Sequence, residues 1–277
     1  MTGRLNLHRF GRTDDTAPTL VLLHGITNSG AGWTDAVARW SGSYRIVAVD
    51  ALGHGLSDRM TDDELAGEGL EAAAGAIESL VTTTIAELEL LAAASGPVVL
   101  YGHSMGGATA SAIAGRRPDL LRAAVLEDPA WQEPSASLWA SRGAAWLATA
   151  RADRVDTAGA VARELADPEN VWPLSEIEPW VVAHTQVDDR FIAIGRTEQP
   201  QPYRELAAAL AVPTLLVTGT EGVIIDAEHI AALHELANPL LEVAVVDGAG
   251  HSVRRDRTNQ FHAVVDPWVA SQAVGRP

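Results

Sequence analysis

The sequence predicts an α/β fold in which a mostly parallel sheet is covered by helices on both faces. Two observations carry this prediction: short apolar runs alternate with helical stretches along the chain, and one long segment interrupts the alternation. The 277 residues are enough to bury a substantial core in one α/β domain that carries an insertion. We find no internal repeat, and the Ala-rich stretches are typical of helix faces.

The expected strands are short apolar runs bounded by turn residues. A segment at 5–10 suits an antiparallel edge, and the remaining runs are 20–23, 45–49, 98–101, 123–126, 214–218 and 241–246. The clearest helix lies between the runs 45–49 and 98–101, where apolar residues recur at close to the helical period: Ile77, Leu80, Val81, Ile85, Leu88 and Leu91.

The segment 131–211 contains no convincing buried strand. It holds turn prolines and five of the eight tryptophans, which are Trp131, Trp139, Trp146, Trp172 and Trp180. We therefore expect residues 1–130 and 212–277 to form the core domain, with 131–211 as a helical insertion.

The most informative motif is Gly102-His103-Ser104-Met105-Gly106. It follows the apolar run 97–101 and precedes a helix of small residues at 108–115, which is the strand–turn–helix context of a G-x-S-x-G nucleophile elbow. The glycines tolerate the close backbone approach of such a turn. Ser104 is thus expected at the end of a strand, at a helix N-terminus whose amides favour developing negative charge.

Three further motifs accompany the elbow: Leu20-Val21-Leu22-Leu23-His24-Gly25, the D-x-x-G-x-G-x-S turn at 50–57, and Gly248-Ala249-Gly250-His251. In this order and spacing the chain resembles the α/β-hydrolase superfamily along nearly all of its length. The resemblance implies the α/β-hydrolase fold, with 131–211 as a helical cap (lid) above the nucleophile. It also implies a hydrophobic substrate pocket lined by cap residues.

A serine nucleophile needs an imidazole to take its proton. Among nine histidines, His251 is the candidate, because it follows the apolar run 241–246 through an Asp-Gly-Ala-Gly loop. We expect activity to fall at acidic pH near the ~6.5 reference of histidine. His229 and His234 are five residues apart, so the H-E-x-x-H metal motif is not met, and no metal is expected.

The third member of the triad departs from the common pattern. Most relatives carry an Asp shortly after the strand expected at 214–218, but here Gly222 occupies that position. Some members, including one branch of the haloalkane dehalogenases and the zearalenone lactonases, place the acid after the strand corresponding to 123–126. Alignment without gaps lands on Asp128, which we predict as the acid. Glu127, Glu221 and Asp226 remain as alternatives.

The resemblance assigns the oxyanion hole to the backbone amides of Met105 and Ile26, with Gly25 beside the substrate. From the expected cap, Trp131 and His184 are predicted to contact the substrate.

The predicted activity is hydrolysis of a carboxylic ester or lactone of a hydrophobic small molecule, through an acyl-enzyme and with no cofactor. Hydrolysis of a carbon–carbon bond and cofactor-independent oxygenation on the same framework are alternatives, as is a non-catalytic ligand-binding module. Amide and thioester substrates stay open.

Composition limits the kinds of partner that the protein can bind. A formal charge of −16 argues against binding to nucleic acid or to anionic lipid. The chain has no cysteine, and neither a signal-peptide pattern nor a window of ~20 apolar residues is found. We therefore expect no membrane association and a cytoplasmic location, and leave open whether the protein is a homodimer.

Overall fold

The computed structural model describes residues 3–14, 16–66, 70–132 and 136–273. Within these residues one seven-stranded sheet has the strand order β1-β3-β2-β4-β5-β6-β7. The strands are β1 (Asn6–Gly11), β2 (Thr19–Leu23), β3 (Arg45–Asp50), β4 (Val98–His103), β5 (Leu121–Glu127), β6 (Thr214–Thr218) and β7 (Leu241–Val245). All neighbours pair in parallel except β1, which runs antiparallel to β3 at one edge. The predicted α/β-hydrolase fold, with a mostly parallel sheet and an antiparallel edge strand, is confirmed.

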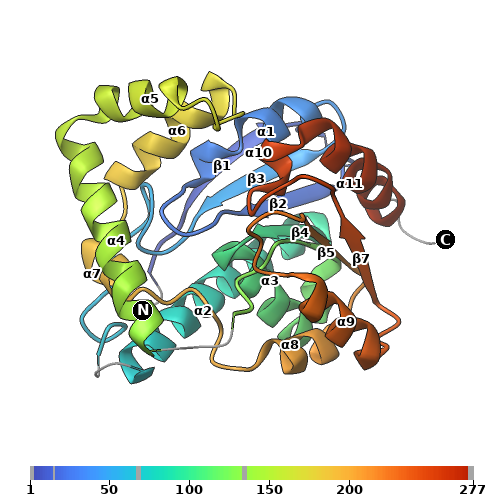
Figure 1. Cartoon of the computed structure of the whole chain (residues 1–277). Helices are drawn as coiled ribbons and strands as arrows, with labels where there is room; N and C mark the ends of the chain where they lie inside the picture. The colour runs from blue at the N-terminus through green and yellow to red at the C-terminus, as the bar shows by residue number, and fades with distance from the viewer. Residues whose placement is uncertain (1–2, 15, 67–69, 133–135, 274–277) are drawn as a thin grey trace.

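The sheet is buried on both faces because helices cover each of them (Figure 1). One layer contains α2 (Leu70–Ser95), α3 (Met105–Arg116), α8 (Tyr203–Ala209) and α9 (Ala227–Leu236); the other contains α1 (Thr34–Trp40), α10 (Val253–Asp256) and α11 (Thr258–Ala273). Two short 3₁₀ turns, Gly30–Gly32 and Pro118–Leu120, precede α1 and β5. Successive residues of one strand pack against opposite helix layers. In β2, Val21 and Leu23 belong to the hydrophobic core beneath α2 and α3, and Leu20 and Leu22 belong to the core beneath α1 and α11.

Four helices lie outside these layers and beside the carboxyl ends of the strands, on the left of Figure 1. They are α4 (Ala136–Val155), α5 (Thr157–Ala166), α6 (Leu174–Thr185) and α7 (Asp189–Ile194). The helix α4 packs against the other three, and α6 also packs against the turn at Gly30–Gly32. By contrast α8 packs against α3 and α9, as part of the core layers.

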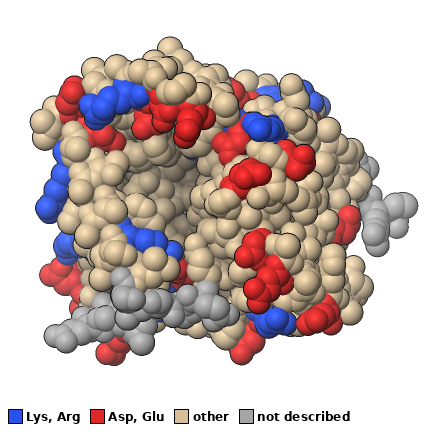
Figure 2. All heavy atoms as spheres, in the orientation of Figure 1, with Lys and Arg blue, Asp and Glu red and all other residues tan. Residues whose placement is uncertain are grey.

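The predicted division into a core and a cap at 131–211 stays a prediction, and residues 133–135 lie outside the described residues. Between the helices on the left and the body on the right, the surface is hollowed, and few charged side chains are visible inside the hollow (Figure 2). No helix among the described residues is long and apolar enough to cross a bilayer.

Candidate active site

The turn from β4 into α3 holds Ser104 in a strained conformation. Its φ of 53° and ψ of −116° are outside the regions that non-glycine residues ordinarily adopt. The flanking glycines permit this geometry, because a Cβ on Gly102 would lie 2.2 Å from the carbonyl oxygen of Gly106. A Cβ on Gly106 would lie 2.2 Å from the carbonyl oxygen of Leu23. The elbow therefore depends on close backbone packing between β2, β4 and α3.

Backbone hydrogen bonds tie Ser104 to the end of β5. Its amide donates to the carbonyl oxygen of Glu127 at 3.0 Å, and its carbonyl oxygen accepts from the amide of Ala130 at 3.0 Å. Gly25 lies on another side of the serine, since a Cβ there would be 3.2 Å from the Cβ of Ser104. Ser104 is thus held between the loop after β2 and the segment after β5.

Asp128 is the carboxylate that contacts His251. The Nδ1 of His251 lies 2.6 Å from the Oδ2 of Asp128, whose side chain is fully buried. The ring of His251 also lies beside that of His103, the residue before the serine, with centroids 4.8 Å apart. The structure therefore brings His251 and Asp128 together next to the elbow.

Three further donors hold the Asp128 carboxylate. Its Oδ1 accepts from the Thr218 hydroxyl and the Ile225 amide, both at 2.9 Å, and its Oδ2 accepts from the Ile224 amide at 2.9 Å. Burial alone would raise the pKa of Asp128, but the hydrogen bond and charge of His251 and the two amides together lower it. A positive φ of 36° at Asp128 turns the chain as it leaves β5.

The alternative acids have other contacts. Glu127 is buried on the opposite side of the strand, where its carboxylate accepts from the Tyr101 hydroxyl and, at 2.7 Å, from the Arg254 amide. Asp226 is the N-cap of α9 and accepts from the amides of Glu228 and His229, as its position before the helix predicts. Glu221 is exposed at the start of the β6–α9 connection.

The amides predicted for an oxyanion hole belong to Ile26 and Met105. Met105 is the first residue of α3, where backbone amides lack an acceptor within the helix. The loop carrying Ile26 is anchored by His24, whose Nδ1 donates to the carbonyl oxygen of Gly25 at 2.7 Å and whose Nε2 accepts from the Ala51 amide at 3.0 Å. Burial lowers the pKa of His24, which suits this neutral tautomer. Among the hydrogen bonds of the described residues, neither the Ile26 amide nor the Met105 amide has an acceptor.

Two side chains predicted to contact the substrate are buried and have partners within the protein. Trp131 is buried in the main core, where its indole nitrogen donates to the Ser111 hydroxyl at 3.1 Å and its ring stacks on Tyr203. His184 of α6 is buried, with its Nδ1 2.7 Å from the carboxylate of Asp153 in α4. Both side chains are buried, and the contacts with substrate predicted for them stay predictions.

Cavity size does not by itself locate a substrate. A cavity of about 790 Å³ lies between α6 and the β1 edge of the sheet, lined among others by His8, Asp50 and Leu56, but by neither Ser104 nor His251. The Asp50 carboxylate in its wall is already satisfied by donors within the chain. Within the described ranges no group of three His, Asp or Glu side chains is arranged to hold a metal ion.

A signal that the sequence analysis left unused is the pair Arg254-Arg255, which begins three residues after His251. Both guanidinium groups are buried, and both lie against the carboxylate of Glu176 from α6. Two adjacent arginines inside an apolar layer imply a buried acid, but nothing in the sequence indicates which acid it is.

Comparison with known proteins agrees with this architecture. Over 261 residues the chain is 27% identical to 2-(acetamidomethylene)succinate hydrolase of Mesorhizobium japonicum, covering 91% of this chain and 87% of that protein. It is 26% identical to the sn-1-specific diacylglycerol lipase ABHD11 of Mus musculus, covering 93% and 82%. The crystal structure of the enol-lactonase from Burkholderia xenovorans LB400 superposes with a TM-score of 0.71 at 23% identity, covering 97% of each chain. The model of the alpha/beta hydrolase family matches residues 20–264, and the chain belongs to that family.

Proposed function

We propose that this protein is a serine hydrolase that cleaves a carboxylic ester or lactone of a hydrophobic small molecule. The observation that carries the proposal is the contact of 2.6 Å between His251 Nδ1 and the buried Asp128 carboxylate, beside a strained Ser104 elbow. The family membership supports hydrolysis in general. The lipase among the relatives supports an ester bond.

The role of Asp128 in this proposal is to fix the tautomer of His251. Because a carboxylate accepts the proton of Nδ1, the neutral ring keeps its free lone pair on Nε2. That nitrogen takes the proton of the Ser104 hydroxyl as its oxygen attacks the carbonyl carbon of the substrate. The protonated ring then gives the proton to the leaving alkoxide, and the acyl group stays on Ser104.

The negative charge that forms on the carbonyl oxygen is held by the amides of Ile26 and Met105. Among the described residues neither amide donates to another acceptor, and that of Met105 stands at the N-terminus of α3, so both are available to the oxyanion. Water, activated by His251, then attacks the acyl carbon and releases the acid and free Ser104. The helices α4 to α7, which lie beside the carboxyl ends of the strands, would form the cap over this site (Figure 1).

The test is a panel of p-nitrophenyl esters of graded chain length, an aliphatic lactone and a β-diketone, with release of product measured for each. We expect hydrolysis of the esters or the lactone, lost in Ser104→Ala and retained in Ser271→Ala, a serine on the exposed face of α11. Cleavage of the β-diketone alone would favour carbon–carbon hydrolysis. A folded Ser104→Ala protein that hydrolyses esters at the wild-type rate would refute the proposal.

A further inference from the structure

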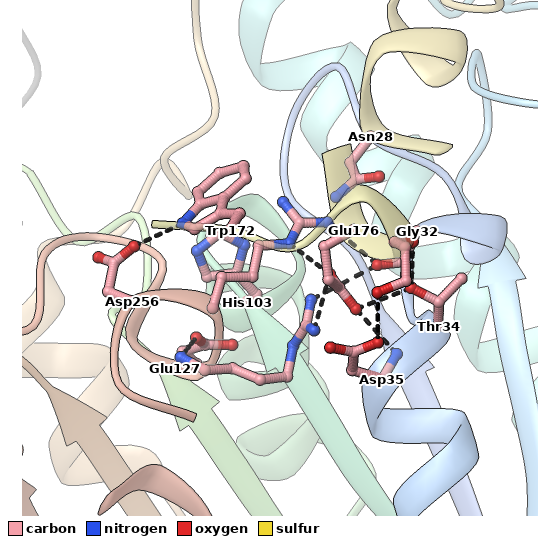
Figure 3. Close-up of polar contacts among 12 residues, drawn as sticks. Asn28, Gly32, Thr34, Asp35, His103, Glu127, Trp172, Glu176 and Asp256 are labelled. Carbon is pink, nitrogen blue, oxygen red and sulfur yellow. Dashed lines mark hydrogen bonds and ion pairs between the residues drawn. The ribbon is translucent and has the colours of Figure 1, made fainter. Parts of the chain in front are cut away.

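A cluster of buried charges joins α6 of the insertion to the segment that follows His251. The Oε2 of Glu176 lies 2.6 Å from the Nε of Arg255 and 2.9 Å from the Nη1 of Arg254. All three side chains are almost fully buried. Figure 3 shows Glu176 extending from its helix into the space between the loops of the core.

The other oxygen of Glu176 contacts the start of α1. Its Oε1 accepts from the Thr34 hydroxyl and from the Asp35 amide, both at 2.9 Å. Arg255 reaches the same region, because its Nη2 donates to the carbonyl oxygen of Gly32 at 3.0 Å. One carboxylate of α6 therefore bridges the segment after the loop of Ile26 and the segment after His251 (Figure 3).

A second connection runs through Trp172, just before α6. Its indole nitrogen donates to the Oδ1 of Asp256 at 2.7 Å, and the Oδ2 of Asp256 accepts from the amide of Gly250 at 2.8 Å. Gly250 directly precedes His251. The guanidinium of Arg255 also lies over the ring of Trp172, with its Cζ 4.6 Å from the ring centroid.

The core holds the same segment from the opposite side. The carbonyl oxygen of His251 accepts from the Nε2 of His103 at 3.0 Å, and the amide of Arg254 donates to Glu127 at 2.7 Å. Residues 250–255 are thus fixed both by β4 and β5 and by the insertion. The loop itself contains Gly248 and Gly250, so its backbone contributes little rigidity of its own.

A purely stabilising role is a weak explanation for such a cluster. Buried ion pairs are often no more stabilising than apolar side chains of similar volume, because charges lose their hydration on burial. What the cluster does supply is a defined position for each group, since hydrogen bonds to charged partners are directional and strong. The groups positioned here are those on either side of His251.

We propose, on the basis of the proposed function, that Glu176 and Trp172 of the segment 131–211 are positioning residues, which hold His251 where it can take the proton of Ser104. Glu176 acts through the two arginines and the start of α1, and Trp172 acts through Asp256 and Gly250. The helix α6 thereby completes the alignment of the base with Ser104. A displacement of about 1 Å in a reacting group is enough to lower a rate about 100-fold.

The test measures the rate at which a fluorophosphonate labels the serine, together with kcat and KM on p-nitrophenyl butyrate and the midpoint of thermal unfolding. We expect Glu176→Gln to label about 10- to 100-fold more slowly and to lose kcat by the same factor, with KM within about threefold of the wild type. The matched control is Glu169→Gln. It removes the same charge from an exposed side chain of the insertion that has no polar contact among the described residues.

Trp172→Phe is the second variant, because it removes the indole donor to Asp256 and keeps a smaller ring beneath Arg255. It is expected to slow labelling several-fold at unchanged KM while remaining folded, even if Glu176→Gln does not fold. Wild-type labelling rates in a folded Trp172→Phe protein, or a rise in KM without a fall in labelling rate, would overturn the inference. Failure of the wild type itself to be labelled would instead refute the proposed function.

Discussion

Substituting Asp128 by asparagine tests the proposed acid with little change in shape. The carboxylate accepts four hydrogen bonds, two on each oxygen: Thr218 and Ile225 on Oδ1, and Ile224 and His251 on Oδ2. An asparagine has only one oxygen, so its amide nitrogen must replace one of these acceptors. No orientation of the new side chain satisfies all four donors.

The two orientations damage the site in different ways. With the amide nitrogen toward His251, Nδ1 of the ring must accept a hydrogen bond, so the single proton of the neutral ring sits on Nε2, which then cannot take the proton of Ser104. With the nitrogen toward Ile225, the tautomer is kept, but the negative charge that stabilises the imidazolium is lost. We expect kcat/KM to fall by up to about 10⁴, as when the orienting acid of a serine protease is replaced in this way. One buried amide left without an acceptor costs about 1–3 kcal/mol of unfolding free energy.

The assay is ester hydrolysis with thermal unfolding measured in parallel. The matched control is Asp226→Asn, where an exposed N-cap is replaced by an equally good one, so activity should stay within about twofold. If a folded Asp128→Asn protein kept more than about a tenth of the wild-type kcat/KM, Asp128 would not be the orienting acid.

Three other predictions follow from the same geometry. His251→Ala should remove most turnover and phosphonate labelling while keeping the fold, and the assignment fails if His184→Ala causes the larger loss. Gly25→Ala places a Cβ 3.0 Å from His103 Nδ1 and 3.2 Å from Ser104 Cβ, so a shift of Ser104 should lower kcat about tenfold; unchanged kcat would contradict that packing. Burial would raise the pKa of Glu176, but the charges of Arg254 and Arg255 lower it from 4.5 to about 2. The ionised Glu176 carboxylate therefore stabilises the fold above pH 4.5, and this stabilisation is lost as the pH falls toward 2. The wild type should therefore lose more thermal stability than Glu176→Gln over that interval, and parallel losses would contradict the ion pairing.

The sheet was predictable because its strands are apolar runs of the right length. Runs such as 20–23 and 214–218 are buried on both faces of the sheet, so their residues are almost all apolar, with Thr214 and Thr218 at the ends of the second run. The contact of Asp128 with His251 could also be predicted from the sequence. Alternation along a strand allows only one of Glu127 and Asp128 to face the histidine, and the structure assigns the other to Tyr101 and Arg254.

The contacts of the segment 131–211 were not predictable in the same way. Trp131 lies after β5, where a tryptophan suits a core as well as a pocket, and only its packing against Tyr203 shows that it is buried. His184 likewise pairs with an acid 31 positions away. Glu176 and Arg255 are 79 positions apart and meet only because α6 folds back over the loops of the core. A single sequence contains no pattern that links such distant partners.

The most direct test of the central claim is to find where the acyl group is during turnover. The enzyme would be mixed with p-nitrophenyl butyrate, quenched in acid within the first turnovers, digested and mapped by mass spectrometry. We predict a butyryl group on the peptide that contains Ser104, and no butyryl group on that peptide in Ser104→Ala. In Asp128→Asn the amount should approach one butyryl group per protein if the substitution slows deacylation more than acylation. A butyryl group on another residue, or turnover at the wild-type rate in a folded Ser104→Ala protein, would contradict it.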